Sequence, residues 1–517
     1  MQILINDIKM PKEHTKEQVI EAAREIVRLA CVSAKNYHIY RQSLDARRKS
    51  NIHYVYAVTA EADSETGIGG KIRKIDIAEE LSVIKKPLKT RPVVVGMGPC
   101  GLFAAWILTL SGNPPLIIER GGDVDSRAES VRNFWRTGIL DKNSNVQFGE
   151  GGAGTFSDGK LNTRISDPKQ RFVLKTFADF GAPADIMYKA KPHIGTDKLR
   201  GTVKNMRNKL IELGAEVRFN TCVTDIRIKN GRLCGAELSD GSFAECENLI
   251  LAIGHSSRDT YEKLCAGGVG LEPKPFAIGA RIEHSQSFID GLQYGETRGL
   301  PPADYRVVYN GSERSCYSFC MCPGGTVVNA SSEEKMLAVN GMSCYARDGG
   351  NANSALVVNV RPGDFEGGVL GGMELQRRYE ALAFKAGGGD GKAPVQLAED
   401  FVKDRPSESL GSVIPTVTSG FRLAELKKCL PPFVADTLRE GLINFESRMK
   451  GFASSGAVLT GIESRTSAPL RILRGESMQS VNVCGLYPSG EGAGYAGGIV
   501  SAAVDGIRCA LALIDND

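Results

Sequence analysis

One short stretch constrains the fold of this chain more than any other: three valines followed by the spacing G-x-G-x-x-G at Gly96, Gly98 and Gly101. The valines predict a buried strand at residues 93–95, and the apolar run after the last glycine predicts a helix over residues 101–110. In such a unit the first glycine permits a tight turn, the second lets the backbone approach a pyrophosphate, and the third lets helix and strand pack closely. The amides and dipole of the helix N-terminus then face the phosphate charge.

A carboxylate follows the next predicted strand at the place where an adenosine would need it. The strand over residues 116–118 ends at Glu119, 18 residues after Gly101. There a carboxylate can accept hydrogen bonds from both ribose hydroxyls. A glycine spacing alone recurs by chance in a chain with 59 glycines. Strand, turn, helix, strand and acid in this order favour a dinucleotide site over a purely structural turn.

Composition excludes several other classes of protein. The chain is 42% hydrophobic and 24% charged, which are globular proportions. Residues 92–118 are uncharged and long enough to span a bilayer, but glycines and prolines interrupt them, so we predict no membrane segment. Thirteen cysteines, an odd number, and a charged N-terminus predict a cytoplasmic protein with reduced thiols. Cys316, Cys320 and Cys322 lack a CxxC pair, so we expect no metal site.

A second glycine cluster near the end of the chain indicates a flavin. Residues 486–499 read as a strand end, an acid at Glu491, glycines and a helix start. A helix N-terminus there can hold the ribityl chain and pyrimidine edge of a flavin, while the loop over residues 147–155 can offer further amides. No second G-x-G-x-x-G follows a strand, so we expect no separate nicotinamide domain. We therefore predict FAD, bound by Gly96, Gly98, Pro99, Cys100, Gly101, Glu119, Arg120, Gly151, Gly152, Thr155, Val223, Gly254, Gly490, Glu491, Gly497, Gly498 and Ile499.

Several long motifs resemble one bacterial family. They are NVQFGEGGAGTFSDGKLNTR, LAIGHSSRD, YSFCMCPGG, NGMS followed by NANSA, ESRTSAPLRI and LYPSGEGAGYAGGIVSAAVDGI. The chain resembles, over nearly its whole length, uncharacterised FAD-dependent dehydrogenases with a glutathione-reductase-like FAD-binding fold. The resemblance implies a flavin cofactor and redox chemistry without naming a substrate. Compared with glutathione-reductase-type flavoproteins, Glu491 replaces the usual Asp and Ile253 replaces the usual threonine. Ser489 stands where we expect cysteine in many members of the resembling family. No His or Cys in these motifs marks an attachment site, so we expect non-covalent FAD.

The predicted fold class is α/β, in four segments. Residues 1–90 read as a small α+β, ferredoxin-like module, with strands at residues 3–8, 37–40 and 52–60. Residues 91–270 form the first part of a Rossmann-like FAD-binding domain, in which one strand spans residues 243–252. Residues 271–475 form an inserted α+β substrate domain. Residues 476–517 return to the FAD-binding domain.

No side chain is identified as catalytic, but four are candidates. Imidazole titrates near neutrality, which makes His255 a candidate, whereas His284 continues an apolar face and reads as a core residue. Lys160 can offset negative charge on a reduced flavin, and Cys320 can face substrate or pack. Arg465 lies in a polar cluster with Glu463, Thr466 and Ser467, where it can bind an anionic substrate or form a structural salt bridge.

Three functions remain open at this point. The first is an FAD-dependent oxidoreductase that transfers hydride through flavin N5 to or from a small molecule, with NADH or NADPH as a possible electron donor. The second is an RNA-associated flavoprotein, because residues 1–91 carry 17 basic and 12 acidic side chains. The third is a redox-sensing flavin-binding protein without catalysis. Substrate identity, reaction direction and oligomeric state do not follow from the sequence.

Overall fold

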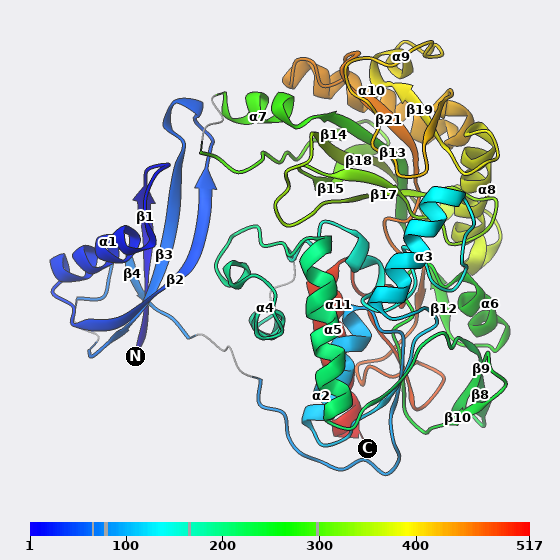
Figure 1. Ribbon diagram of the computed structural model, residues 1–517. Coiled ribbons are helices and arrows are strands. Elements are labelled where there is room, and N and C mark those ends of the chain that lie inside the picture. The colour runs from blue at the N-terminus through cyan, green and yellow to red at the C-terminus, as the bar shows by residue number, and fades with distance from the viewer. Residues whose placement is uncertain (65–66, 77–80, 164–166, 296–298, 517) are drawn as a thin grey trace.

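The chain folds into a small N-terminal module, a parallel sheet with its helices, and a mixed sheet (Figure 1). The computed structural model describes residues 1–64, 67–76, 81–163, 167–295 and 299–516. A small N-terminal module stands to the left, a mixed sheet lies at the top, and a parallel sheet with its helices lies below (Figure 1). Arg164, the last residue of the motif that begins at Asn145, lies outside the described residues.

The N-terminal module is an antiparallel sheet with one helix. The sheet order is β2-β3-β1-β4, and every neighbouring pair is antiparallel. Thr15 and Gln18 form the capping box that begins the helix, because each side chain accepts from the backbone amide of the other. The elements are β1 (Gln2–Met10), α1 (Lys16–Leu29), β2 (Ala34–Asp45), β3 (His53–Ala62) and β4 (Ile72–Lys74). Strand β2 is longer than the sequence pattern predicted.

The edge strand β2 attaches this module to the rest of the molecule. The Gln42 amide donates to the Tyr188 carbonyl at 2.7 Å, and the Ala190 amide donates to the Gln42 carbonyl at 2.8 Å. The Arg171 guanidinium lies over the ring of Tyr40, 4.8 Å from its centroid. An edge strand that would otherwise expose its backbone groups is thereby partly covered.

The parallel sheet is built from segments far apart in the sequence. Its order is β23-β11-β5-β6-β7, and all neighbours run parallel. The strands are β5 (Val93–Val95), β6 (Leu116–Ile118), β7 (Glu216–Arg218), β11 (Leu249–Leu251) and β23 (Leu486–Pro488). Its helices are α2 (Pro99–Leu110), α3 (Val124–Thr137), α4 (Lys169–Asp179), α5 (Thr196–Glu212), α6 (Arg258–Ala266) and α11 (Ile499–Asn516). The uncharged stretch is thus a strand, a helix and a strand.

The strand predicted at residues 243–252 is two strands in two sheets. β10 (Phe243–Glu245) pairs with β9 (Arg232–Leu238), which pairs with β8 (Val223–Lys229) in an antiparallel sheet. β11 instead joins the parallel sheet. The division falls at residues 246–248, where the chain leaves the smaller sheet and turns toward β5.

A mixed seven-stranded sheet covers the open side of the parallel unit. Its order is β14-β15-β18-β13-β21-β19-β20. The strands are β13 (Phe276–Ser285), β14 (Val308–Asn310), β15 (Ser315–Cys322), β18 (Asn351–Val360), β19 (Ala393–Leu397), β20 (Phe421–Leu423) and β21 (Val458–Glu463). Packed around them are α7 (Gln286–Tyr294), α8 (Gly371–Ala386), α9 (Ala398–Val402), α10 (Pro432–Arg448) and the hairpin of β16 (Thr326–Asn329) and β17 (Val339–Met342). One pair, β12 (Leu271–Pro273) with β22 (Leu470–Ile472), flanks the entry to and exit from this sheet.

The close packing of α2 and α11 depends on one glycine. A Cβ added at Gly506 would lie 2.1 Å from the Cys100 carbonyl oxygen, which is backbone and cannot move aside cheaply. Gly506→Ala is expected to lower the free energy of unfolding by about 1–3 kcal/mol. Gly201→Ala is the matched control, because Gly201 lies in helix α5 with nothing near an added Cβ, and it should be neutral or stabilising by up to about 1 kcal/mol. Urea denaturation of both variants tests this; equal effects would contradict it.

Candidate functional site

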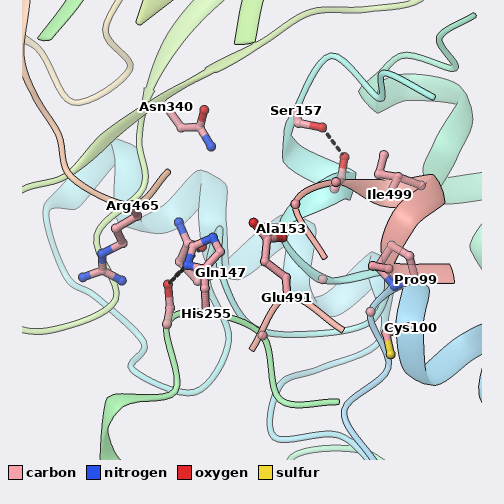
Figure 2. A pocket seen from close by; sticks show the side chains of 18 of the residues that line it. Pro99, Cys100, Gln147, Ala153, Ser157, His255, Asn340, Arg465, Glu491 and Ile499 are labelled. Carbon is pink, nitrogen blue, oxygen red and sulfur yellow. Dashed lines mark hydrogen bonds between the residues drawn. The ribbon is translucent and has the colours of Figure 1, made fainter. Parts of the chain in front are cut away.

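A cavity of about 490 Å³ lies at the carboxyl ends of the parallel strands, beneath the mixed sheet. Ligands bind at this end of a doubly wound sheet because the loops that follow the strands gather there. Side chains from distant segments converge on it in Figure 2, with Pro99 and Ile499 on one side, His255 and Arg465 on the other, and Glu491 between them. Residues of β15 close the cavity from the mixed sheet.

The fingerprint turn leaves backbone donors free at one wall. Gly98 is the N-cap of α2 and supplies no side-chain hydrogen bond, and Pro99 occupies the first turn. The amides of Cys100 and Gly101 therefore have no partner within the helix, as in any first turn. A Cβ at Gly101 would lie 1.9 Å from the Gly96 carbonyl oxygen, so this glycine serves the close packing expected of it. Such a helix N-terminus suits a phosphate group.

Glu119 is buried behind this turn and is nearly saturated by backbone donors. Its carboxylate accepts from the amides of Met97 at 2.7 Å, Gly121 at 2.9 Å and Gly149 at 3.0 Å. A carboxylate offers about four acceptor positions, so roughly one is left for the cavity that Glu119 lines.

Three glycines form an open cradle along the same cavity. Gly254, Gly497 and Gly498 line the cavity, and a Cβ added to any of them would meet no protein atom within 4 Å. Gly497 and Gly498 stand directly before α11, whose N-terminus faces the same space. A group as flat and wide as a flavin fits against backbone that carries no side chains.

Most of the predicted cofactor residues meet at this cavity. Those that line it are Gly96, Gly98, Pro99, Cys100, Glu119, Arg120, Gly152, Val223, Gly254, Glu491, Gly497, Gly498 and Ile499. Gly101, Gly151, Thr155 and Gly490 lie behind the wall. Gly151 has a φ of +83° and sits against Thr155, and the Gly490 amide donates to Asp505 at 2.7 Å. These four shape the wall and do not face the cavity.

Arg127 is an organising residue that the sequence did not reveal. It is fully buried on α3, and its guanidinium donates to carbonyls of Asn145, Val146 and Glu150 and to the Thr155 hydroxyl. It thereby fixes the glycine-rich loop over residues 145–155. An arginine in an amphipathic helix reads as solvent-exposed, so no local pattern distinguishes it.

Lys160 is held at the cavity by a buried carboxylate. Its ammonium lies 3.3 Å from Asp158 and donates to the Met321 carbonyl. Asp158 is itself fixed by Arg347 and Ser343. Burial works against the charged form, but nearby Cys322 and Asp158 raise the pKa of Lys160 above its ordinary value. The lysine is therefore a fixed positive charge beside the cavity.

Cys320 lines the cavity on the same side as Lys160. It adopts a left-handed backbone with a φ of +47°, within the irregular part of β15 next to the pairing of Cys322 with β18. Its carbonyl accepts from the buried Arg281 at 2.7 Å. Burial raises the pKa of the Cys320 thiol, although Lys160 opposes this shift. The thiol is thus neutral. Its position is set by the backbone of Cys320, which the hydrogen bond from Arg281 holds in place.

The other candidate side chains serve different roles. His255 lines the cavity, and burial together with Arg465 and Arg258 lowers its pKa to about 4, so it is neutral at pH 7. Arg465 forms a bidentate pair with the buried Glu380 at 3.0 and 2.8 Å. His284 is fully buried, and its Nε2 lies 2.8 Å from the Phe452 carbonyl oxygen, which agrees with a core residue.

The polar cluster predicted around Arg465 is divided among separate partners. Glu463 pairs with Arg281 at 3.1 Å, and the Thr466 hydroxyl donates to the Ala277 carbonyl at 3.0 Å. The Ser467 hydroxyl lies 3.5 Å from the Lys274 ammonium. Glu463, Thr466 and Ser467 therefore attach this segment to β13 or to the residues just before it. Arg465 instead attaches the segment to α8.

The described residues offer neither a metal-binding cluster nor a membrane-spanning helix. No group of three or more His, Cys, Asp or Glu side chains is arranged there to hold a metal ion. No helix in that part of the chain has the length and apolar content needed to cross a membrane.

Comparison with known proteins places the chain in a family. It is 50% identical over 529 residues to a protein of Clostridium beijerinckii described as an uncharacterized protein, and the match covers 100% of this chain and 99% of that one. The chain therefore belongs to the same family as that protein. Residues 275–466 match the family described as FAD-dependent protein, C-terminal domain-like, and residues 1–61 match a domain of unknown function.

Two further likenesses are more distant. A thiamine thiazole synthase of Aeropyrum pernix is 26% identical over 171 residues, which cover 32% of this chain and 51% of that protein. The crystal structure of a glycine oxidase from Bacillus cereus aligns over 83% of this chain and 98% of its own, with 13% identity and a TM-score of 0.32.

Glu491 gives the site a titration near neutrality. Burial raises its pKa to about 7, and the nearby Lys274 only partly opposes this. The folded protein therefore binds a proton at Glu491 between about pH 4.5 and pH 7 that the unfolded chain has released. Stability from this proton is complete below about pH 4.5 and is lost as the pH rises through 7.

Glu491→Gln is expected to remove that part of the pH dependence. The difference in the free energy of unfolding between wild type and variant should fall as the pH rises from 5 to 7.5. Glu150, whose pKa burial also raises to about 7, is present in both proteins and cancels in the comparison. Urea denaturation at several pH values measures this difference, and a difference that stays constant with pH would refute the assignment.

Proposed function

We propose that the cavity binds FAD non-covalently and that the protein is an FAD-dependent oxidoreductase acting on a small molecule. One observation carries the proposal: two glycine clusters almost 400 residues apart in sequence line the same cavity, each at the N-terminus of a buried helix. The family description of residues 275–466 as the C-terminal domain of FAD-dependent proteins supports the same cofactor.

Different residues of the cavity suit different parts of the dinucleotide. The free amides at the start of α2 suit the pyrophosphate, and Glu119 suits a ribose hydroxyl. Gly497 and Gly498 would offer bare backbone against which a flavin could lie, and the dipole of α11 would favour negative charge on it. Bound FAD supplies hydride transfer at N5. Lys160 adds a fixed positive charge on the side of the cavity that β15 closes.

A nicotinamide electron donor would have no binding domain of its own in this chain. The sequence shows no second dinucleotide fingerprint after a strand, so NADH or NADPH would bind without a domain of its own. The RNA-associated and the purely redox-sensing alternatives stay predictions from the sequence.

A variant that fills the cradle tests the cofactor site. Gly498→Leu introduces a side chain into open space, so the protein should fold while FAD binds at least about tenfold more weakly. Gly475→Leu is the matched control, because Gly475 also has open space around it and does not line the cavity. FAD affinity is measured by quenching of flavin fluorescence. Equal affinities for both variants and wild type would contradict this placement of the cofactor.

Anaerobic reduction separates an enzyme from a redox-sensing protein. The purified protein is expected to show the visible flavin absorption, to lose it when NADH or NADPH is added, and to release free FAD on heating. A flavin that neither nicotinamide reduces would argue against nicotinamide as the donor. Pigment that stays on the heat-denatured chain would contradict non-covalent binding.

A further inference from the structure

A second cavity of about 510 Å³ adjoins the first at the N-terminal end of α11. The two share Phe319, Thr466 and Gly497 as lining residues. Because Gly497 also belongs to the open cradle, a molecule in the second cavity would lie next to whatever occupies that cradle. The second cavity therefore lies where a substrate could be held next to the proposed cofactor site.

The floor and one wall of this cavity are flat and apolar. Ala277 on β13 packs with Val357 on β18, and the partly buried rings of Tyr317 and Phe319 pack against them. Tyr317 and Phe319 alternate on β15 and thus point to the same face of the sheet. The Tyr317 hydroxyl donates to the Asn359 side chain at 2.9 Å, which fixes that ring. Two aromatic rings over small residues suit a planar group.

Two cations stand at one end of the same cavity. Lys274 precedes β13 and Arg361 follows β18, and these strand ends are adjacent because Phe276 pairs with Val360. Among the described residues neither side chain has a carboxylate within ion-pair distance. The Lys274 ammonium has only the Pro275 carbonyl and the Ser467 hydroxyl, each at 3.5 Å.

Arg361 is likewise left with its charge uncompensated by an ion pair. Its guanidinium donates to the Glu313 carbonyl at 2.8 Å. Asp364 accepts from the backbone amide of Arg361, but the ion pair of that carboxylate is with Arg314. Lys274 is also half-buried, and burial together with Arg471 lowers its pKa, although Glu491, beyond ion-pair distance, partly opposes this. An anion at this end of the cavity would supply the missing partner to both cations.

We propose that the second cavity binds a planar anion, a conjugated or aromatic group bearing a carboxylate or phosphate, with its charge on Lys274 and Arg361 and its flat part against Phe319. This inference rests on the proposed function, because it names the class of substrate that the flavin site would oxidise or reduce. Phe319 and Gly497 belong to both cavities, so the flat part of the ligand points toward the cofactor site.

Calorimetric titration with cinnamate tests the proposal on the purified full-length protein. Titration with phenyl phosphate shows whether the cavity prefers a phosphate to the carboxylate of cinnamate. Cinnamamide has the same flat part as cinnamate but no charge, and it serves as the neutral control. We expect at least one of the two anions to bind, and cinnamamide to bind at least about tenfold more weakly than cinnamate or not at all. Lys274→Met and Arg361→Met should each weaken anion binding at least about tenfold, while Lys274→Arg retains it.

Arg422→Met is the matched control, because Arg422 lies on β20 at the opposite edge of the same sheet and lines neither cavity. Its affinity for the anions should equal that of wild type. Absence of binding by both anions, equal binding of cinnamamide, or unchanged affinity in both methionine variants would each overturn the inference. A colourless protein would instead contradict the proposed function. Calorimetry reports anion binding whether or not flavin is present, so the two failures are distinguishable.

Discussion

The contact between α2 and α11 is the constraint on which the site depends. Gly506 lets the two helices approach until the backbone of Cys100 fills the place of a side chain. Gly490 makes a second such contact, because an added Cβ would lie 2.8 Å from the Cys100 Cβ. These contacts hold the end of the chain against the fingerprint turn. Both helix N-termini then open into one cavity, and their backbone donors become available to a single ligand.

The mixed sheet closes the site on one side and contributes charged and polar side chains to it. Buried ion pairs fasten it there: Arg258 on α6 pairs with Glu380 on α8, and Asp158 pairs with Arg347. Breaking one partner of such a pair leaves a buried charge, so these contacts fix geometry more than they add stability. Lys274 and Arg361, which lack carboxylate partners within ion-pair distance among the described residues, line the second cavity at the end of this sheet.

Local patterns were sufficient for the nucleotide unit and insufficient for what surrounds it. Strand, turn and helix at residues 93–110 follow from valines, glycines and an apolar run, all within one stretch of sequence. Arg127 and Asp158 act through contacts with residues distant in sequence, which no periodicity encodes. The sequence did not decide whether Arg465 binds a ligand or forms a salt bridge. Its partner Glu380 lies on α8, and the sequence spacing does not show which side of that helix faces Arg465. Glu119 lines the cavity, but its three backbone donors come from turns that only the folded chain assembles.

If both glycine clusters hold one cofactor, amide hydrogen exchange with and without FAD will show it. FAD is expected to slow exchange at residues 98–101 and at residues 497–499 together, with the same dependence on FAD concentration. Protection of one segment alone, or of neither, would contradict it.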